Sequence, residues 1–221
     1  NLLDAARRAW IGEDGGRRFV LVSTDEVFGS LSPREAPWDE SAPVAPNSPY
    51  SASKAASDHL VRAWGETYGL PVLLSNCSNN YGPKQHDEKL IPTVIRKALN
   101  GDNIPIYGDG KNIRDWLYVL DHCTGIELAY QKGRSGEVYN VGGKNERNNN
   151  YIAHSICEQL DVLKPKASGS YKDQITYVED RAGHDRRYAI DASKLEGELG
   201  WKAAENFETG IKKTIQWYLE K

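Results

Sequence analysis

Residues 18–29 read RFVLVSTDEVFG, a short apolar run followed by two adjacent carboxylates. The run from Arg18 to Ser23 is rich in Val and Leu, which is typical of a strand buried in a parallel sheet. Open α/β sheets bind their ligands at the carboxyl ends of such strands. We therefore expect Thr24, Asp25 and Glu26 to emerge where a ligand binds.

Helices and strands alternate along the chain, which predicts an α/β protein with a doubly wound parallel sheet. Strands or extended segments are expected at residues 18–23, 72–75, 104–107, 116–120, 138–141, 175–178 and 187–190. Helices are expected at residues 1–8, 90–100, 121–131, 151–160, 192–199 and 207–219. A further helix begins after Ser48, with Pro49 at its first position, and ends at Gly69. Residues 76–89 are expected to form a polar loop.

Composition narrows the possible classes of protein. The chain has 221 residues, 39% of them hydrophobic, so it can bury one sizeable core or two small ones. Its net charge of −3, with the signs interspersed, gives no basic surface for nucleic acid. No apolar stretch approaches the ~20 residues that span a bilayer, and no signal peptide opens the chain. We expect a cytoplasmic protein without a nucleic-acid or membrane partner.

The three cysteines, Cys77, Cys123 and Cys157, are widely spaced and show neither a CxxC pair nor a metal-ligand spacing. Reduced thiols in a cytosol are the expected state. The five histidines are equally scattered, so no metal site is expected. The chain contains no Met, so we expect a segment upstream of Asn1.

Tyr50 and Lys54 lie four residues apart, the spacing that places two side chains on one helix face. The spacing alone is weak evidence for catalysis, because Tyr107 and Lys111 share it and about one such pair is expected by chance. The place of Tyr50 at the start of a helix favours a catalytic role, because the helix dipole there stabilises a developing phenolate. A free Tyr has a pKa of ~10, so a role as base needs a nearby cation such as Lys54 or a nicotinamide ring.

Asp25 and Glu26 allow two interpretations. Adjacent acids after a strand are often only a solvated turn or an acidic helix start. In a shielded cleft, however, two neighbouring carboxyls can have their protonation states pushed apart, which gives one acid and one base.

Six ordered motifs resemble those of the dTDP-glucose 4,6-dehydratase family, within the extended short-chain dehydrogenase/reductases. They are residues 23–29 (STDEVFG), 50–55 (YSASKA), 77–83 (CSNNYGP), 89–92 (KLIP), 112–119 (NIRDWLYV) and 180–188 (DRAGHDRRY). The match runs through nearly the whole chain. The resemblance implies a Rossmann-like fold, incomplete at its N-terminus, with a smaller α+β substrate-binding domain.

The resemblance also implies a redox-neutral dehydration of a nucleotide-activated glucose with tightly held NAD. Tyr50, aided by Lys54 and Thr24, would take the proton of the sugar 4-hydroxyl while hydride leaves C4. Glu26 would then act as base at C5 and Asp25 would protonate the departing 6-hydroxyl. Return of hydride to C6 would give the 4-keto-6-deoxy sugar nucleotide.

Ligand contacts follow from the same resemblance. The implied cofactor contacts are Ser23, Tyr50, Lys54 and Asn80. The implied substrate contacts are Thr24, Asn79, Lys89, Leu90, Ile91, Pro92, Pro105, Ile106, Tyr107, Arg114, Asn140, Arg181 and His184. Arg114 and Arg181 could supply forked donors for a diphosphate, and Tyr107 a flat surface beside a base. Without the resemblance, an ion pair of Arg114 with Asp115 and ordinary packing of Tyr107 are the simpler interpretations.

Some family features are absent or altered. The glycine-rich GxxGxxG turn, whose backbone N–H groups reach the cofactor diphosphate, is missing with roughly the first third of the fold. Gly12, Gly15 and Gly16 follow a helix and precede a strand, the reverse of the required order. Asn76, Leu120 and Ala182 replace a usual Arg, acid and Pro. We therefore expect the C-terminal portion of a dehydratase, poorly soluble or inactive by itself.

The implied cofactor domain comprises residues 1–78 and 115–143, and residues 79–114 and 144–221 form mainly the substrate domain. A homodimer is expected through the helix that bears Tyr50 and its neighbour at residues 1–10. A nucleotide-sugar 4-epimerase or a UDP-glucuronate decarboxylase shares the Tyr/Lys helix but not the full Thr-Asp-Glu run. A non-catalytic sugar-nucleotide-binding fragment is the alternative from another class. Whether dTDP, UDP or GDP carries the sugar stays open.

Overall fold

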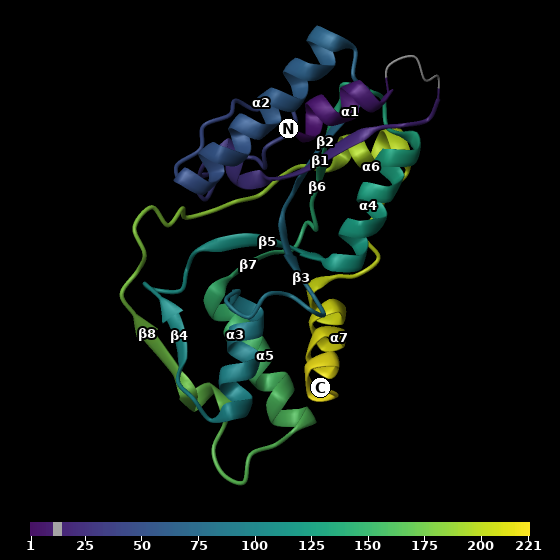
Figure 1. The fold of residues 1–221 in the computed structure, drawn as a ribbon. Coiled ribbons are helices and arrows are strands. Elements are labelled where there is room, and N and C mark those ends of the chain that lie inside the picture. The colour runs from purple at the N-terminus through teal and green to yellow at the C-terminus, as the bar shows by residue number, and fades with distance from the viewer. Residues whose placement is uncertain (11–14) are drawn as a thin grey trace.

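The computed structural model describes residues 1–10 and 15–221 and has two lobes (Figure 1). In the upper lobe, β1 (Phe19–Thr24), β2 (Val72–Cys77) and β6 (Val138–Val141) form a parallel sheet in the order β1-β2-β6. The register pairs Ser23 with Asn76 and Thr24 with Cys77. The carboxyl ends of β1 and β2 therefore lie side by side.

Helices cover both faces of this sheet. Alternate residues of a strand point to opposite faces, and the two core clusters follow this alternation. Val72 and Leu74 of β2 pack with α1 (Leu2–Trp10) and α2 (Pro49–Tyr68). Leu73 packs with residues of α4 (Val119–Lys132) and α6 (Ser193–Leu199). The chain is thus an α/β protein whose parallel sheet is wound on both faces, as the alternation of elements predicts.

The lower lobe is built around α3 (Leu90–Asn100), α5 (Asn149–Leu163) and α7 (Phe207–Leu219). Its core contains Ile95 of α3, Ile156 of α5 and Ile211 of α7. Two small sheets border it. They are β4 (Ile104–Tyr107) with β8 (Ile175–Val178), which are parallel, and β3 (Asn79–Tyr81), β5 (Ile113–Tyr118) and β7 (Glu146–Asn148), where β5 and β7 are antiparallel.

Most predicted elements are confirmed, several to the residue. Ser48 caps α2 through a capping box and Gly69 ends it in a left-handed conformation. The predictions for α3, α7, β4, β6 and β8 match the observed bounds. Two short single-turn 3-10 helices, η1 (Asp25–Phe28) and η2 (Tyr171–Gln174), were not predicted.

Other expectations need correction. The strand predicted at 116–120 is β5, which begins at Ile113 and ends at Tyr118, where α4 starts. The predicted loop 76–89 contains β3, and β7 was missed, because strands of three residues owe their pairing to β5 rather than to their own sequence. Residues 187–190 make only isolated bridges, Arg187 with Ile113 and Ile190 with Trp38. Of the three glycines considered as a cofactor turn, Gly12 lies outside the described residues.

Candidate active site

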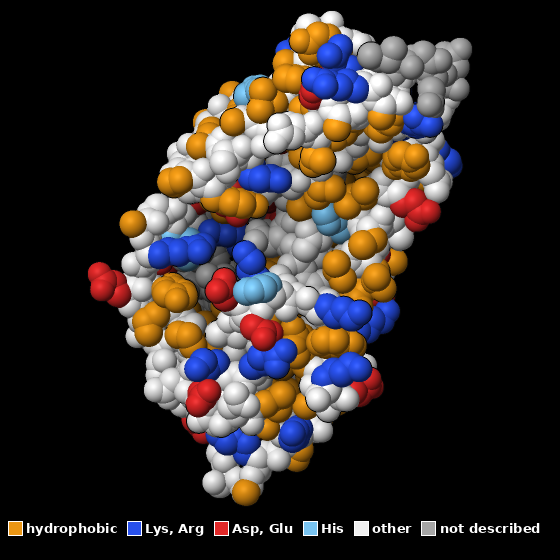
Figure 2. All heavy atoms as spheres, in the orientation of Figure 1, with side chains coloured by type: hydrophobic (Ala, Val, Ile, Leu, Met, Phe, Trp, Pro, Cys, Tyr) orange, Lys and Arg blue, Asp and Glu red, His pale blue; other side chains and the backbone are white. Residues whose placement is uncertain are grey.

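The carboxyl ends of β1 and β2 carry the polar residues that the sequence singles out. Thr24 ends β1 and caps η1, its hydroxyl accepting a hydrogen bond from the backbone N–H of Glu26 (3.3 Å). Asp25 and Glu26 form the first turn of η1, at the sheet edge where ligands of parallel sheets bind. Figure 2 shows a hollow on this face below α2, with basic side chains at its rim.

Asp25 is buried, with 2% of its surface exposed. Burial, together with the charges of Glu26 and Asp115, raises the pKa of its carboxyl well above the ordinary value, although Arg114 opposes the shift. Among the described residues, its Oδ2 atom has no hydrogen-bond partner. These surroundings therefore favour the protonated form of Asp25, which is the form that can give a proton.

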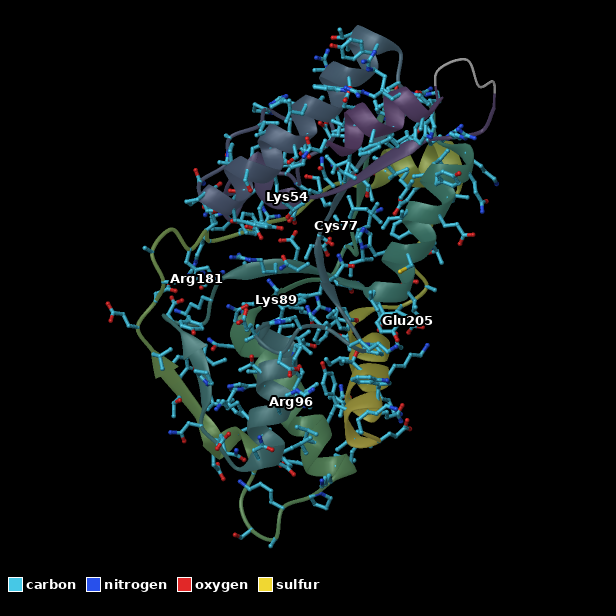
Figure 3. All side chains as sticks on the ribbon, viewed as in Figure 1. Lys54, Cys77, Lys89, Arg96, Arg181 and Glu205 are labelled. Carbon is cyan, nitrogen blue, oxygen red and sulfur yellow. The ribbon has the colours of Figure 1, made fainter. Side chains whose placement is uncertain are left out.

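Glu26 differs from its neighbour because its side chain is only half-buried. Burial raises the pKa of its carboxyl too, but Arg114, Arg181 and Lys89 all favour the charged form. Figure 3 shows Lys89, which directly precedes α3, and Arg181, in the segment that follows β8, both below Lys54. The two carboxyls are thus unequal, and Glu26 is the one better suited to accept a proton.

Tyr50 and Lys54 lie in the first two turns of α2. Lys54 donates a hydrogen bond from Nζ to the backbone oxygen of Val22 (2.9 Å), and Figure 3 shows it below α2 near Cys77. The Tyr50 side chain is half exposed, and partial burial with the charge of Glu26 raises the pKa of its hydroxyl. A role as base therefore requires a cation closer to the phenol than this arrangement provides.

Ser23 fixes α2 against the sheet. Its hydroxyl donates to Oδ2 of Asp58, a helix residue that lies one turn beyond Lys54 (2.9 Å). This buried hydrogen bond ties α2 to the end of β1. It therefore helps to position Tyr50 and Lys54 near the ends of the strands.

Arg114 of β5 is buried beside the two carboxyls and acts electrostatically on both. It donates from Nη1 to the backbone oxygen of Ile113 (2.7 Å) and from Nη2 to that of Asp185 (2.9 Å). The simpler interpretation, an ion pair with Asp115, does not describe this residue. Asp115 instead accepts from the backbone N–H groups of Gly143 (2.8 Å) and Asn145 (2.6 Å).

Two asparagines and a histidine complete the polar surroundings. Asn80 of β3 donates from Nδ2 to Sγ of Cys77 (3.3 Å), and Asn79 precedes it on the same strand. The Nδ1 atom of His184 lies 2.6 Å from Oδ1 of Asp180. Burial lowers the pKa of His184, although the hydrogen bond with Asp180 opposes the shift, so its surroundings favour the neutral imidazole.

The other predicted substrate residues are less accessible or lie further along the lower lobe. Ile91, Pro92, Ile106 and Asn140 are buried, and Asn140 donates from Nδ2 to the backbone oxygen of Trp38 (3.0 Å). Leu90 begins α3, directly after Lys89. Pro105 and Tyr107 lie on β4, and Tyr107 is exposed.

Residues that the sequence did not single out also contribute. Asp115 raises the pKa of Asp25, and Asp185 and Tyr188 contact Arg114. All three lie inside the quoted motifs 112–119 and 180–188, so the motifs contained the signal. Their roles depend on contacts between β5 and a distant segment, which no local pattern reveals.

A parallel sheet wound on both faces, with a Tyr and a Lys one helical turn apart at its carboxyl edge, defines an α/β protein of the Rossmann-like class. The family model described as GDP-mannose 4,6 dehydratase matches residues 1–214. The chain belongs to this family.

Individual relatives agree with this assignment. The chain is 58% identical over 223 residues to the dTDP-glucose 4,6-dehydratase of Xanthomonas campestris, an alignment that covers 99% of this chain and 63% of the relative. The chain thus spans less than two thirds of that protein's length.

Solved structures agree as well. The dTDP-glucose 4,6-dehydratase of Streptomyces venezuelae with NAD bound superposes with a TM-score of 0.89 at 44% identity, covering 100% of this chain and 64% of that chain. The Bacillus anthracis enzyme of the same name, in complex with NAD, gives 0.87 at 46% identity and covers 100% and 66%. Over the described residues, no helix has the length and apolar character needed to cross a membrane.

Proposed function

We propose that the protein catalyses the NAD-dependent dehydration of dTDP-glucose to the 4-keto-6-deoxy sugar nucleotide. The observation that carries the proposal is the unequal environment of Asp25 and Glu26 at the end of β1. The names of the relatives, which are dTDP-glucose 4,6-dehydratases, two of them crystallised with NAD, support the same activity.

The residues at the ends of β2 and β3 fit a cofactor with amide and hydroxyl groups. Within the described chain, Oδ1 of Asn76 and Oδ1 of Asn80 are buried polar atoms without a partner. Such atoms are costly unless a ligand or water bonds to them. Ser23, Tyr50, Lys54 and Asn80 would contact NAD, which when bound accepts a hydride from C4 and later returns it to C6.

Residues of α2 carry out the first step, the removal of the proton from the sugar 4-hydroxyl. Tyr50, as the phenolate and oriented together with Thr24, takes the proton of the sugar 4-hydroxyl and becomes a neutral phenol. The pKa of Tyr50 is raised in its present surroundings, so Lys54, one helical turn away, must supply the positive charge that stabilises the phenolate before this transfer.

The carboxyl groups of Asp25 and Glu26 carry out the dehydration. The ketone at C4 acidifies the C5–H bond, and Glu26, stabilised as a carboxylate by Arg114 and Arg181, accepts that proton. Asp25, whose protonated form burial favours, gives its proton to the 6-hydroxyl as the C6–O bond breaks and water leaves. Glu26 returns its proton to C5 when hydride reaches C6.

Substrate binding is proposed for the basic side of the hollow. Arg114, Arg181 and Lys89 supply the positive charge that a diphosphate requires, and the planar fork of Arg suits its oxygens. The full proposed set of substrate contacts is Thr24, Asn79, Lys89, Leu90, Ile91, Pro92, Pro105, Ile106, Tyr107, Arg114, Asn140, Arg181 and His184.

A double variant, Asp25→Asn with Glu26→Gln, tests the assignment in the full-length protein. We expect it to keep the transfer of hydride from the sugar to NAD in a single turnover and to lose the 4-keto-6-deoxy product. Asp39→Asn with Glu40→Gln is the matched control, a second Asp-Glu pair whose amide replacements still accept the bonds from Ser41 and Asn140. Unchanged product formation would reject the assignment, and formation of a C4 epimer would favour a 4-epimerase.

Comparing dTDP-glucose, UDP-glucose and GDP-mannose as substrates tests the nucleotide. Product should form fastest from dTDP-glucose. Faster turnover of either other nucleotide sugar would contradict that part of the proposal.

We further propose a cytoplasmic homodimer. The pair α1 and α2 supports the dimer, because the two helices lie in contact and leave Leu2, Leu60 and Tyr68 exposed. Free thiols at three cysteines support the compartment. Light scattering on the purified protein should give twice the monomer mass, and a monomer mass would contradict the proposal.

We also propose the division into a cofactor domain, residues 1–78 and 115–143, and a mainly substrate-binding domain, residues 79–114 and 144–221. The sheet β1-β2-β6 falls in the first set and the helices α3, α5 and α7 in the second, which supports the division. Helix α6 belongs to the second set by number but packs on the first sheet through Leu195.

A further inference from the structure

Asp185 lies where four hydrogen bonds from three segments meet. Its carboxylate accepts from Nδ2 of Asn47 (2.9 Å) and from the hydroxyl of Tyr188. Its backbone oxygen accepts from Nη2 of Arg114 (2.9 Å) and Nδ2 of Asn112 (3.2 Å). The residue therefore joins the segment that follows β8 both to β5 and to the loop before α2.

The partners of Asp185 belong to elements that carry the candidate site. Asn47 directly precedes Ser48, the residue that caps α2, and so lies three residues before Tyr50. The charge of Asp185 is also felt at Glu26, whose pKa it raises. A displacement of Asp185 would thus affect both α2, which bears Tyr50, and the carboxyl pair Asp25 and Glu26.

Tyr188 connects the carboxylate of Asp185 to the guanidinium of Arg114. The ring of Tyr188 is buried, with 6% of the residue exposed, and Arg114 lies over its face at 4.3 Å from the ring centre. Burial and the bond to Asp185 raise the pKa of the Tyr188 hydroxyl, which stays a donor. A fixed ring fixes the plane of the guanidinium above it.

We propose that Asp185 is a positioning residue that acts through Tyr188 to hold the guanidinium of Arg114 in the plane that receives a diphosphate. This inference rests on the proposed function, which makes Arg114 a diphosphate contact. Asp185 itself touches no reacting atom. Its role is to keep the guanidinium of Arg114 in a fixed position relative to the first turn of α2.

Calorimetric titration with dTDP tests the role in binding. We expect Asp185→Asn to weaken binding about tenfold, since it removes the charge and leaves one acceptor oxygen for two donors, and Tyr188→Phe to weaken it by a similar factor, since it removes the hydrogen bond to the carboxylate. Because both act on the same ring, the double variant should bind no more than about twofold more weakly than either single variant. Fully multiplicative losses, or no loss in either single variant, would overturn the inference.

The matched control is Asp109→Asn. Asp109 is a second carboxylate that holds the same segment, through an ion pair with Arg186 (2.9 Å), but it does not contact Arg114 or Tyr188. We expect this variant to bind dTDP within about twofold of the parent. An equal loss of binding in the control would show that Asp185 only anchors the segment, and would overturn the inference.

A second measurement separates this inference from the proposed function. In the ligand-free protein, nitrogen-15 NMR should show slowly exchanging guanidinium protons of Arg114 that exchange rapidly in Asp185→Asn and Tyr188→Phe and remain slow in Asp109→Asn. If the parent protein fails to bind dTDP, the proposed function fails while the NMR result still decides the role of Asp185. Unchanged exchange at Arg114 in Tyr188→Phe, which removes only one oxygen, would contradict that role even if Asp185→Asn does not fold.

Discussion

Asp25 and Glu26 are neighbours in the chain, yet the carboxyl of Asp25 is enclosed by the protein while that of Glu26 faces Arg114, Arg181 and Lys89. The short 3-10 turn after β1 sends the two side chains into these different surroundings. Burial favours the neutral form of a carboxyl and nearby cations favour the charged form. Within one turn of backbone, Asp25 is therefore the better placed to give a proton and Glu26 the better placed to accept one.

Replacing Asp25 with Asn should stabilise the protein at neutral pH. The pKa of Asp25 is raised in the folded state, so its stabilising contribution is complete below the ordinary carboxyl pKa and is lost as pH rises through the folded value. The melting temperature of Asp25→Asn should therefore match that of the parent near pH 4 and exceed it at pH 8. Each 1 kcal/mol corresponds to about 2–4 °C in a chain of this size.

Asp39→Asn provides a control of opposite sign. The hydroxyl and backbone N–H of Ser41 lower the pKa of Asp39, so its contribution is present above the ordinary carboxyl pKa and is lost on acidification. This variant should melt at or below the parent temperature at pH 8. A lower melting temperature for Asp25→Asn at pH 8 would contradict the burial of a neutral carboxyl.

The three cysteines should differ in their reaction with iodoacetamide. Cys123 is exposed, whereas burial raises the pKa of both Cys77 and Cys157 to about 12. Because the thiolate is the reactive form, alkylation of Cys77 and Cys157 at pH 8 should be about a hundredfold or more slower than that of Cys123. Mass spectrometry of the peptides measures each rate, and unfolding in urea should equalise them. Early labelling of Cys77 would show that the end of β2 is open to solvent.

Gly143→Ala should strongly destabilise the turn that holds Asp115. An added Cβ would lie 2.2 Å from the backbone oxygen of Trp116, and the N–H of Gly143 donates to Asp115. We expect a loss of more than about 2 kcal/mol in the free energy of unfolding, measured in urea. Gly197→Ala is the control, since Gly197 lies in α6 with open space around it, and there Ala should add up to about 1 kcal/mol. Equal effects at the two positions would contradict the close packing at Gly143.

Ile156→Ala should lower the free energy of unfolding by about 2–5 kcal/mol. Ile156 is fully buried in the core of the lower lobe between α3, α5 and α7. Val162 lies on the same helix with 80% of its surface exposed, so Val162→Ala should change the free energy by no more than about 0.5 kcal/mol. A small effect at Ile156 would mean that the lower lobe is loosely packed.

Local signals explain which elements could be predicted. The ends of α2 follow from Ser48, Pro49 and Gly69, whose preferences act within one helical turn. The strand β1 follows from its apolar run. The strands β3 and β7 could not be found in this way, because their hydrogen bonds are made with β5, a partner far away in the chain.

The candidate site also has residues that local signals predict and contacts that only the fold explains. Tyr50, Lys54, Asp25 and Glu26 could be placed at the carboxyl edge of the sheet from the order of elements alone. Arg114 was predicted only through a family motif, and its simpler interpretation was an ion pair with its neighbour. The observed contacts with Asp185 and Tyr188 require two segments to meet across the lobes.

The sequence alone determined the alternation of helices and strands and the position of the acidic pair after β1, because these depend on neighbouring residues and on the periodicity of apolar side chains. Only the tertiary structure decided which carboxyl of the pair is buried and which faces the cations. Burial and electrostatic surroundings are set by atoms of β5, the start of α3 and the segment around Asp185, and the fold brings these elements together from distant parts of the chain.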